Sequence, residues 1–187
     1  MKQITLIRHA KVDIDNTQRI GSLFLSQWVE EYDVAPIYKE SLPPKETIAL
    51  AQNANIVVIS MLSRTIDSAK VLGVEVDEKN ELFNEANIPT VNIPFLKLKP
   101  KSWLVILRLL LLFGLGKKDT SLKASKNQAK KAANRLLELS AEHGHVVLVG
   151  HGGMNWLIRQ ELVKEGWKIE DKGSHSNWGM TILQFKG

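Results

Sequence analysis

Short apolar runs alternate along this chain with longer segments whose apolar residues have helical spacing. The apolar runs, each the length of a strand, cover residues 3–7, 55–60, 145–150 and 180–185. Helical spacing covers residues 24–34, 45–53, 64–72 and 154–163, and a longer helix is expected between a Thr120-Ser121 cap and Gly144. Strands that alternate with helices usually pair in parallel, because each helix returns the chain across one face of the sheet. We therefore predict an α/β fold with a mostly parallel sheet and helices on both faces.

Two further features complete this expected order. Gly73 is a good C-terminal residue for the helix at 64–72, and Val-Glu-Val at 74–76 is a candidate strand after it. The chain has 187 residues, of which 44% are hydrophobic and 24% are charged. This length and composition predict one globular domain over residues 1–187.

Composition also excludes some kinds of chemistry. The chain has no cysteine, so it has no disulfide, no thiolate zinc site and no cysteine nucleophile. Its formal net charge of +5 suits a phosphate-bearing substrate, a nucleic acid or an anionic membrane, and does not choose among them. The N-terminus has no charged and apolar leader, which predicts a cytoplasmic location.

Basic and imidazole side chains follow the ends of three expected strands. Arg8 and His9 end the first strand, His151 follows the strand at 145–150, and Arg64 follows the strand at 55–60. Ligands of open α/β sheets bind beyond the carboxyl ends of the strands. Gly152 and the glycine after it open the next helix, where backbone N–H groups can approach an anion closely. If these strands are neighbours, the side chains form a phosphate-binding pocket.

The chemistry of phosphoryl transfer gives each side chain a role. Arg8 and Arg64 can bind the phosphoryl oxygens and stabilise the charge of the transition state. A neutral His9 can attack phosphorus and hold the phosphoryl group covalently, while a protonated His151 donates a further hydrogen bond to it. The leaving oxygen needs a proton from a carboxyl group, for which the acidic segment at 77–87 offers Glu85, with Glu81 as the alternative.

Four motifs, in this order along residues 4–158, resemble those of the histidine phosphatase superfamily, the phosphoglycerate mutase-like branch. They are "LIRHAK", "SMLSRTIDSAKVL", "LFNEA" and "VVLVGHGGMNWLI". The resemblance implies a three-layer αβα sandwich, a phosphohistidine on His9, and Glu85 as proton donor. It further implies a phosphate pocket of Arg8, Arg64 and His151 with the Gly152 backbone, and neither a metal nor another cofactor.

The chain departs from these motifs after the first histidine. Ala10 occupies the position that is commonly glycine, and Val12 the position that is often threonine. Val12 has no hydroxyl group to contact a phosphate. Asp15 and Asn16 lie near the place where the mutases often have an asparagine ligand, so substrate preference is more open than reaction type.

Several alternatives remain at this point. A metal site of His9, His151 and carboxylates fits less well, because the two arginines would repel a cation. His143, His145 and His175 are expected to be non-catalytic. We expect a phosphorylated substrate, a small metabolite or a phosphoprotein, rather than a nucleic acid. The function classes are a phosphomonoester hydrolase, a phosphoglycerate-type mutase, and a pseudoenzyme that binds an anion without turnover.

Residues 86–118 interrupt the alternation and are predicted to form a cap-like insertion. Between Trp103 and Leu115 almost every residue is apolar, with Arg108 the main exception, and lysines flank the segment on both sides. A helix of this length reaches only about 20 Å, too short for a bilayer core of about 30 Å. The segment at 103–115 is therefore either a buried cap helix over the sheet edge, a homodimer contact or a peripheral membrane contact.

Overall fold

The computed structural model describes residues 2–86, 93–112 and 122–186, and within α4 (Pro100–Leu112) it describes side chains only as far as Leu107. The Thr120-Ser121 cap and much of the insertion at 86–118, including the Arg108 side chain, lie outside the described residues.

A six-stranded sheet forms the centre of the molecule, in the order β4-β3-β6-β1-β8-β7. Its strands are β1 (Lys2–Arg8), β3 (Ile56–Ile59), β4 (Glu78–Lys79), β6 (His145–Gly150), β7 (Lys168–Asp171) and β8 (Met180–Phe185). Strands β4, β3, β6 and β1 are parallel, while β8 is antiparallel to β1 and β7 is antiparallel to β8. The mostly parallel sheet is therefore confirmed, with an antiparallel edge made by the last two strands.

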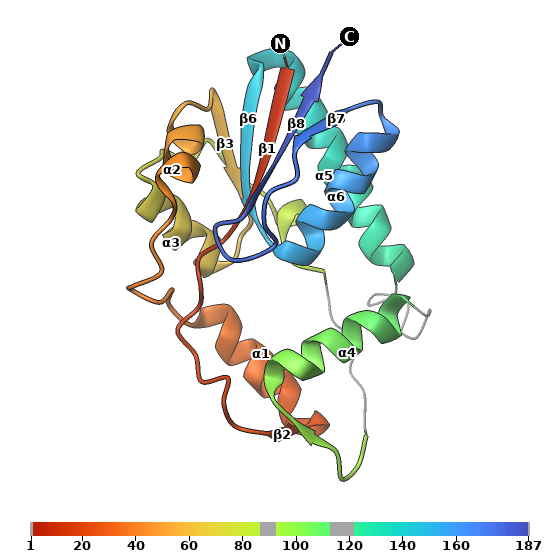
Figure 1. Cartoon of the computed structure of the whole chain (residues 1–187). Coiled ribbons are helices and arrows are strands. Elements are labelled where there is room, and N and C mark those ends of the chain that lie inside the picture. The colour runs from red at the N-terminus through yellow and green to blue at the C-terminus, as the bar shows by residue number, and fades with distance from the viewer. Residues whose placement is uncertain (1, 87–92, 113–121, 187) are drawn as a thin grey trace.

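Helices cover both faces of this sheet. Figure 1 shows α2 (Lys45–Gln52) and α3 (Ser63–Leu72) on one side, and α5 (Leu122–His143) and α6 (Gly152–Lys164) on the other. The three-layer αβα sandwich is confirmed. Gly73 and Gly144 end α3 and α5 with φ of 67° and 84°, a left-handed conformation that glycine adopts without steric cost.

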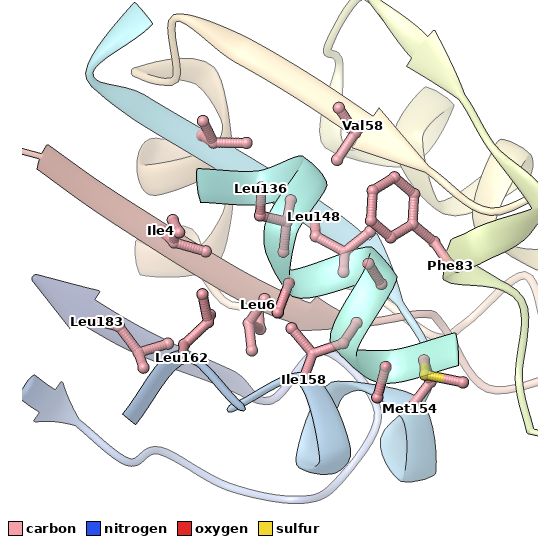
Figure 2. Close-up of a cluster of buried hydrophobic side chains, with 14 of the residues drawn as sticks. Ile4, Leu6, Val58, Phe83, Leu136, Leu148, Met154, Ile158, Leu162 and Leu183 are labelled. Atoms are coloured by element: carbon pink, nitrogen blue, oxygen red, sulfur yellow. The ribbon is translucent and has the colours of Figure 1, made fainter. Parts of the chain in front are cut away.

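Alternation along β1 explains why the sheet has two buried faces. Ile4 and Leu6 belong to the cluster under α5 and α6, together with Phe83 of the 3-10 turn η2 (Glu81–Phe83), as Figure 2 shows. Ile7 belongs to the cluster under α2 and α3. Successive side chains of a strand point to opposite faces, so a continuous apolar run is buried on both.

The remaining elements form a separate layer, which we call the cap. It contains β2 (Ile20–Gly21), the 3-10 turn η1 (Ser22–Phe24), α1 (Leu25–Val34), β5 (Lys97–Leu98) and α4. In Figure 1 the cap lies beyond the carboxyl end of β1, away from both chain termini. Its own apolar cluster centres on Leu25, Trp28, Trp103 and Leu107.

The structure corrects the prediction of a strand at residues 74–76. Residues 74–76 form no strand, because Val74 and Val76 pack against the α2–α3 cluster and the Asp77 carboxylate accepts the Val57 N–H at 2.7 Å. Pairing with β3 begins instead at β4. The described part of the insertion belongs to the cap, where Trp103 and Leu107 pack against α1 and Leu104 and Val105 line a cavity.

The structure also tests whether a membrane span is feasible. Among residues 2–86, 93–112 and 122–186, no helix is both long enough and apolar enough to cross a bilayer.

Candidate active site

Three adjacent parallel strands place the predicted side chains at one edge of the sheet. β6 lies between β3 and β1, with Arg8 opposite Gly150 and Ile59 opposite Val149. The residues that follow these strands, His9, Ser60 and His151, therefore come together. The sequence analysis assumed that these three strands are neighbours in the sheet, and the structure confirms this.

His9 is buried and held in one orientation. Its side chain is 3% exposed, and Nδ1 donates to the Ala10 carbonyl at 2.6 Å, which leaves Nε2 with its lone pair. Burial lowers the pKa of His9 well below its ordinary value, and the nearby His151 and Arg64 lower it further. A neutral imidazole with an unprotonated Nε2 is the form that a nucleophile requires.

His151 lies beside His9, and the centroids of the two rings are 5.2 Å apart. Arg64 Nε donates to its Nδ1 at 3.2 Å, so Nε2 carries the proton and donates to Ser60 Oγ at 2.8 Å. The side chain is fully buried. In this arrangement His151 orients Arg64, and the contact of a protonated His151 with phosphate stays a prediction.

Arg64 stands in the first turn of α3 and reaches the cap. Its buried guanidinium donates from Nη1 to the Asp33 carboxylate at 2.7 Å, and its Cζ lies 4.8 Å from the centroid of the Tyr32 ring. Asp33 and Tyr32 were not predicted as site residues from the sequence. Both belong to α1, whose pattern indicates a helix but not which element its end will meet.

Arg8 reaches a loop near the C-terminus. Nη1 donates to the His175 carbonyl at 2.6 Å, and Asn177 Nδ2 donates to the His9 carbonyl at 2.9 Å. The prediction that the His175 side chain is non-catalytic stays untested, but its loop is part of the site. A Cβ at Gly152 would come within 3.3 Å of Arg8 Nε, so glycine allows this close approach.

Glu85 lies at the N-terminus of α6. Its carboxylate accepts the Met154 N–H at 2.9 Å and the Gly153 N–H at 3.3 Å, as expected for an anionic group at a helix start. A Cβ at Gly153 would lie 2.7 Å from Glu85 Oε1. Glu81, the alternative proton donor, is exposed in η2, so the structure brings Glu85 and not Glu81 to the site.

A cavity of about 500 Å³ joins these groups between the sheet and the cap. Its lining includes His9, Arg8, Arg64 and Glu85. Leu104 and Val105 of α4 and Trp28 and Val29 of α1 line the cap side, and Lys11 and Lys101 add positive charge. The site can therefore bind an anion beside a neutral imidazole and a carboxyl group.

The structure also gives the positions of two other histidines and tests the alternative of a metal site. His145 lies at the start of β6, where its ring contacts Gln3 and Thr5, and His143 pairs with Glu142. Across the described ranges, no group of three or more histidine and carboxylate side chains is arranged to hold a metal ion.

Several solved structures have a similar fold. The product of open reading frame Rv3214 from Mycobacterium tuberculosis has a TM-score of 0.67 and 18% identity, covering 99% of this chain and 92% of that chain. Phosphoserine phosphatase from Entamoeba histolytica has a TM-score of 0.61 and 18% identity, covering 100% and 92%. A mycobacterial glucosyl-3-phosphoglycerate phosphatase has a TM-score of 0.55 and 17% identity, covering 87% and 80%. No family model and no curated protein matches the sequence.

The chain has the phosphoglycerate mutase-like fold. Within this fold the departures after His9 have clear positions. Ala10 is fully buried, and its N–H donates to Ser68 Oγ at 2.9 Å. Val12 and Asn16 line the cavity, whereas the Asp15 carboxylate accepts hydrogen bonds from Thr17. Of these two polar residues, Asn16 is therefore the better placed to contact a ligand in the cavity.

Proposed function

We propose that this protein is a histidine phosphatase that hydrolyses phosphomonoesters through a phosphohistidine on His9, without a metal ion. The main support is the geometry of His9. Its Nδ1 is occupied by a backbone carbonyl and its ring is kept neutral, so Nε2 is available to attack a phosphoryl group beside Arg8 and Arg64. Fold similarity to phosphatases agrees with this proposal.

The first chemical step transfers the phosphoryl group to the enzyme. His9 Nε2 donates its lone pair to phosphorus, and the bond between phosphorus and the leaving oxygen breaks. The leaving oxygen takes a proton from the Glu85 carboxyl group, and the alcohol departs. Arg64 and Arg8 stabilise the charge on the phosphoryl oxygens, and His151 holds Arg64 in place.

The second step returns the enzyme to its starting state. Glu85, now a carboxylate, takes a proton from water while the water oxygen attacks phosphorus. The bond between phosphorus and His9 Nε2 breaks, which releases inorganic phosphate, and Glu85 is again protonated.

The His9→Ala variant tests the nucleophile. We expect kcat on an aryl phosphate, measured with a chelator present, to fall by about 10³-fold or more while the fold is retained. Wild-type protein denatured in alkali during turnover should carry a phosphoryl label that is stable in base and lost in acid. His143→Ala is the matched control, because that ring lies at the opposite end of the sheet and should not affect the rate. An active and labelled His9→Ala protein would refute the assignment.

Two other parts of the proposal need separate measurements. A mutase would return the phosphoryl group to a second hydroxyl. If this protein were a mutase, incubation with a phosphoglycerate would give the isomer, whereas the proposed phosphatase should release phosphate.

The cytoplasmic location remains a prediction, which fractionation of cells that express the tagged protein would test.

A further inference from the structure

Four large apolar side chains are exposed at the end of the cap. The exposed fractions are 73% for Leu23, 64% for Phe24, 102% for Phe95 and 38% for Leu96. We call these four residues the apolar tip. Single exposed apolar residues are common, but a group of this size usually marks an interaction surface.

Backbone pairing brings the two halves of the apolar tip together. β2 pairs with β5, so that Gly21 lies opposite Lys97. The Ile93 N–H donates to Ser22 Oγ at 3.0 Å, which joins the start of η1 to the chain just before Phe95. Both halves lie at the end of the molecule farthest from the two termini (Figure 1).

Phe95 also has an unusual backbone. Its φ is 66°, in the left-handed region that a bulky residue other than glycine rarely adopts. The side chain is fully exposed, so packing within this chain does not offset the cost of that conformation. A strained residue that gains nothing from its own fold indicates a surface shaped for contact with something else.

The charged residues within the two segments that carry the apolar tip are all basic. Arg19, Lys97 and Lys99 are exposed beside it, and residues 16–29 and 93–107 contain no aspartate or glutamate. The nearest carboxylates in the sequence are those of Asp15 and Glu30. The Asp15 carboxylate accepts a hydrogen bond from the Thr17 N–H. A second copy of this chain would bring like charges together, whereas an anionic lipid surface complements them.

We propose that the apolar tip docks this protein on an anionic lipid bilayer, with its aromatic and leucine side chains among the acyl chains and its lysines at the headgroups. This contact differs from the segment at 103–115 considered from the sequence, because Trp103 and Leu107 are buried against α1. The proposal does not depend on catalysis, so binding is measured with the wild type and with His9→Ala.

Co-sedimentation with vesicles tests the proposal. We expect binding to vesicles of phosphatidylcholine with phosphatidylserine, little binding to phosphatidylcholine alone, and weaker binding at high salt. The double variant Phe24→Ser/Phe95→Ser should lose about tenfold or more of the partition coefficient. The control Val34→Ser/Leu42→Ser removes side chains that are 78% and 74% exposed elsewhere, and should bind like the wild type.

A second measurement locates the contact even if the double variant does not fold. Tryptophan introduced as Phe95→Trp should shift its fluorescence to the blue and be quenched by brominated acyl chains in anionic vesicles, whereas Leu42→Trp should not. Wild-type protein that ignores these vesicles, or equal signals from both positions, would overturn the proposal. The proposal would also be overturned if light scattering found the wild type to be a dimer and the Phe24→Ser/Phe95→Ser variant to be a monomer. A second copy of the chain, rather than a bilayer, would then cover the apolar tip.

Discussion

His9 combines burial with chemical availability. Its ring is almost completely buried, yet it lines the cavity and keeps Nε2 unprotonated. The same surroundings that suit the proposed role of nucleophile make its protonation unfavourable. At the scale of one residue, the proposed catalysis and the pH dependence of stability therefore have the same origin.

We expect acid to weaken the fold through His9. In the unfolded chain this imidazole titrates near about 6.5, whereas burial, His151 and Arg64 place its folded-state pKa well below that. The unfolded state then binds more protons below about pH 6.5, so stability should fall as the pH decreases through this range. At about pH 5.5 the loss should be about 1 kcal/mol relative to about pH 7.5.

Urea unfolding of wild type and His9→Gln at these two pH values measures this loss. The pKa of His145 is also lowered by burial, but both proteins keep His145, so the difference between them reports His9. The carboxylates with lowered pKa, Asp15 and Glu78, titrate at a lower pH. The same loss in both proteins would contradict the prediction.

Glu85 is expected to matter most for poor leaving groups. For Glu85→Gln we predict a decrease in kcat of about 10²- to 10⁴-fold on alkyl phosphates, and a smaller decrease on aryl phosphates, whose oxygen departs without a proton. The exposed Glu81→Gln is the control and should leave both rates unchanged. If Glu81→Gln alone shows the selective loss, the role of proton donor belongs to Glu81.

At the scale of elements, helix α1 connects the cap to the carboxyl edge of the sheet. Asp33 near its C-terminus pairs with Arg64 in α3, and Tyr32 lies against the same guanidinium. A phosphoryl group in the cavity would share Arg64 with the Asp33 carboxylate. The cap therefore influences how much positive charge the site presents.

Replacing Asp33 with asparagine should strengthen anion binding. Asp33→Asn removes one negative charge beside Arg64, so we predict that inorganic phosphate inhibits about three- to tenfold more tightly. Glu31→Gln on the same helix is the control, because Glu31 accepts a hydrogen bond from Gln27 instead. Competitive inhibition by phosphate measures the effect, and thermal melting checks that the cap remains folded. Unchanged inhibition would show that Asp33 has no such effect.

At the scale of the whole molecule, the fold places one cavity between two layers of different origin. The sheet with α2, α3, α5 and α6 supplies His9, Arg8, Arg64 and Glu85 around its carboxyl edge. The cap supplies the apolar wall from Trp28, Val29, Leu104 and Val105. Under the proposed function, the sandwich would bind the phosphoryl group and the cap would face the rest of the substrate.

Much of the sandwich could be predicted from local patterns. The apolar runs at 3–7, 55–60 and 145–150 become strands because burial on both faces requires continuous apolar sequence. Gly73 and Gly144 end helices because few other residues adopt their backbone conformation. In contrast, β7 was not predicted, since its four residues are all exposed and carry no alternation of apolar and polar side chains.

Some residues of the candidate site could also be predicted from the sequence, whereas the contacts between them could not. Arg8, His9, Arg64 and His151 could be assigned from the sequence, because strand ends in an α/β sheet meet at one edge whatever the helices between them. Only the tertiary structure decided that His151 orients Arg64, that Asp33 pairs with it, that Glu85 rather than Glu81 lies at the start of α6, and that the apolar insertion packs on α1. These contacts join residues distant in sequence, so they depend on how whole elements pack and leave no periodic signal along the chain.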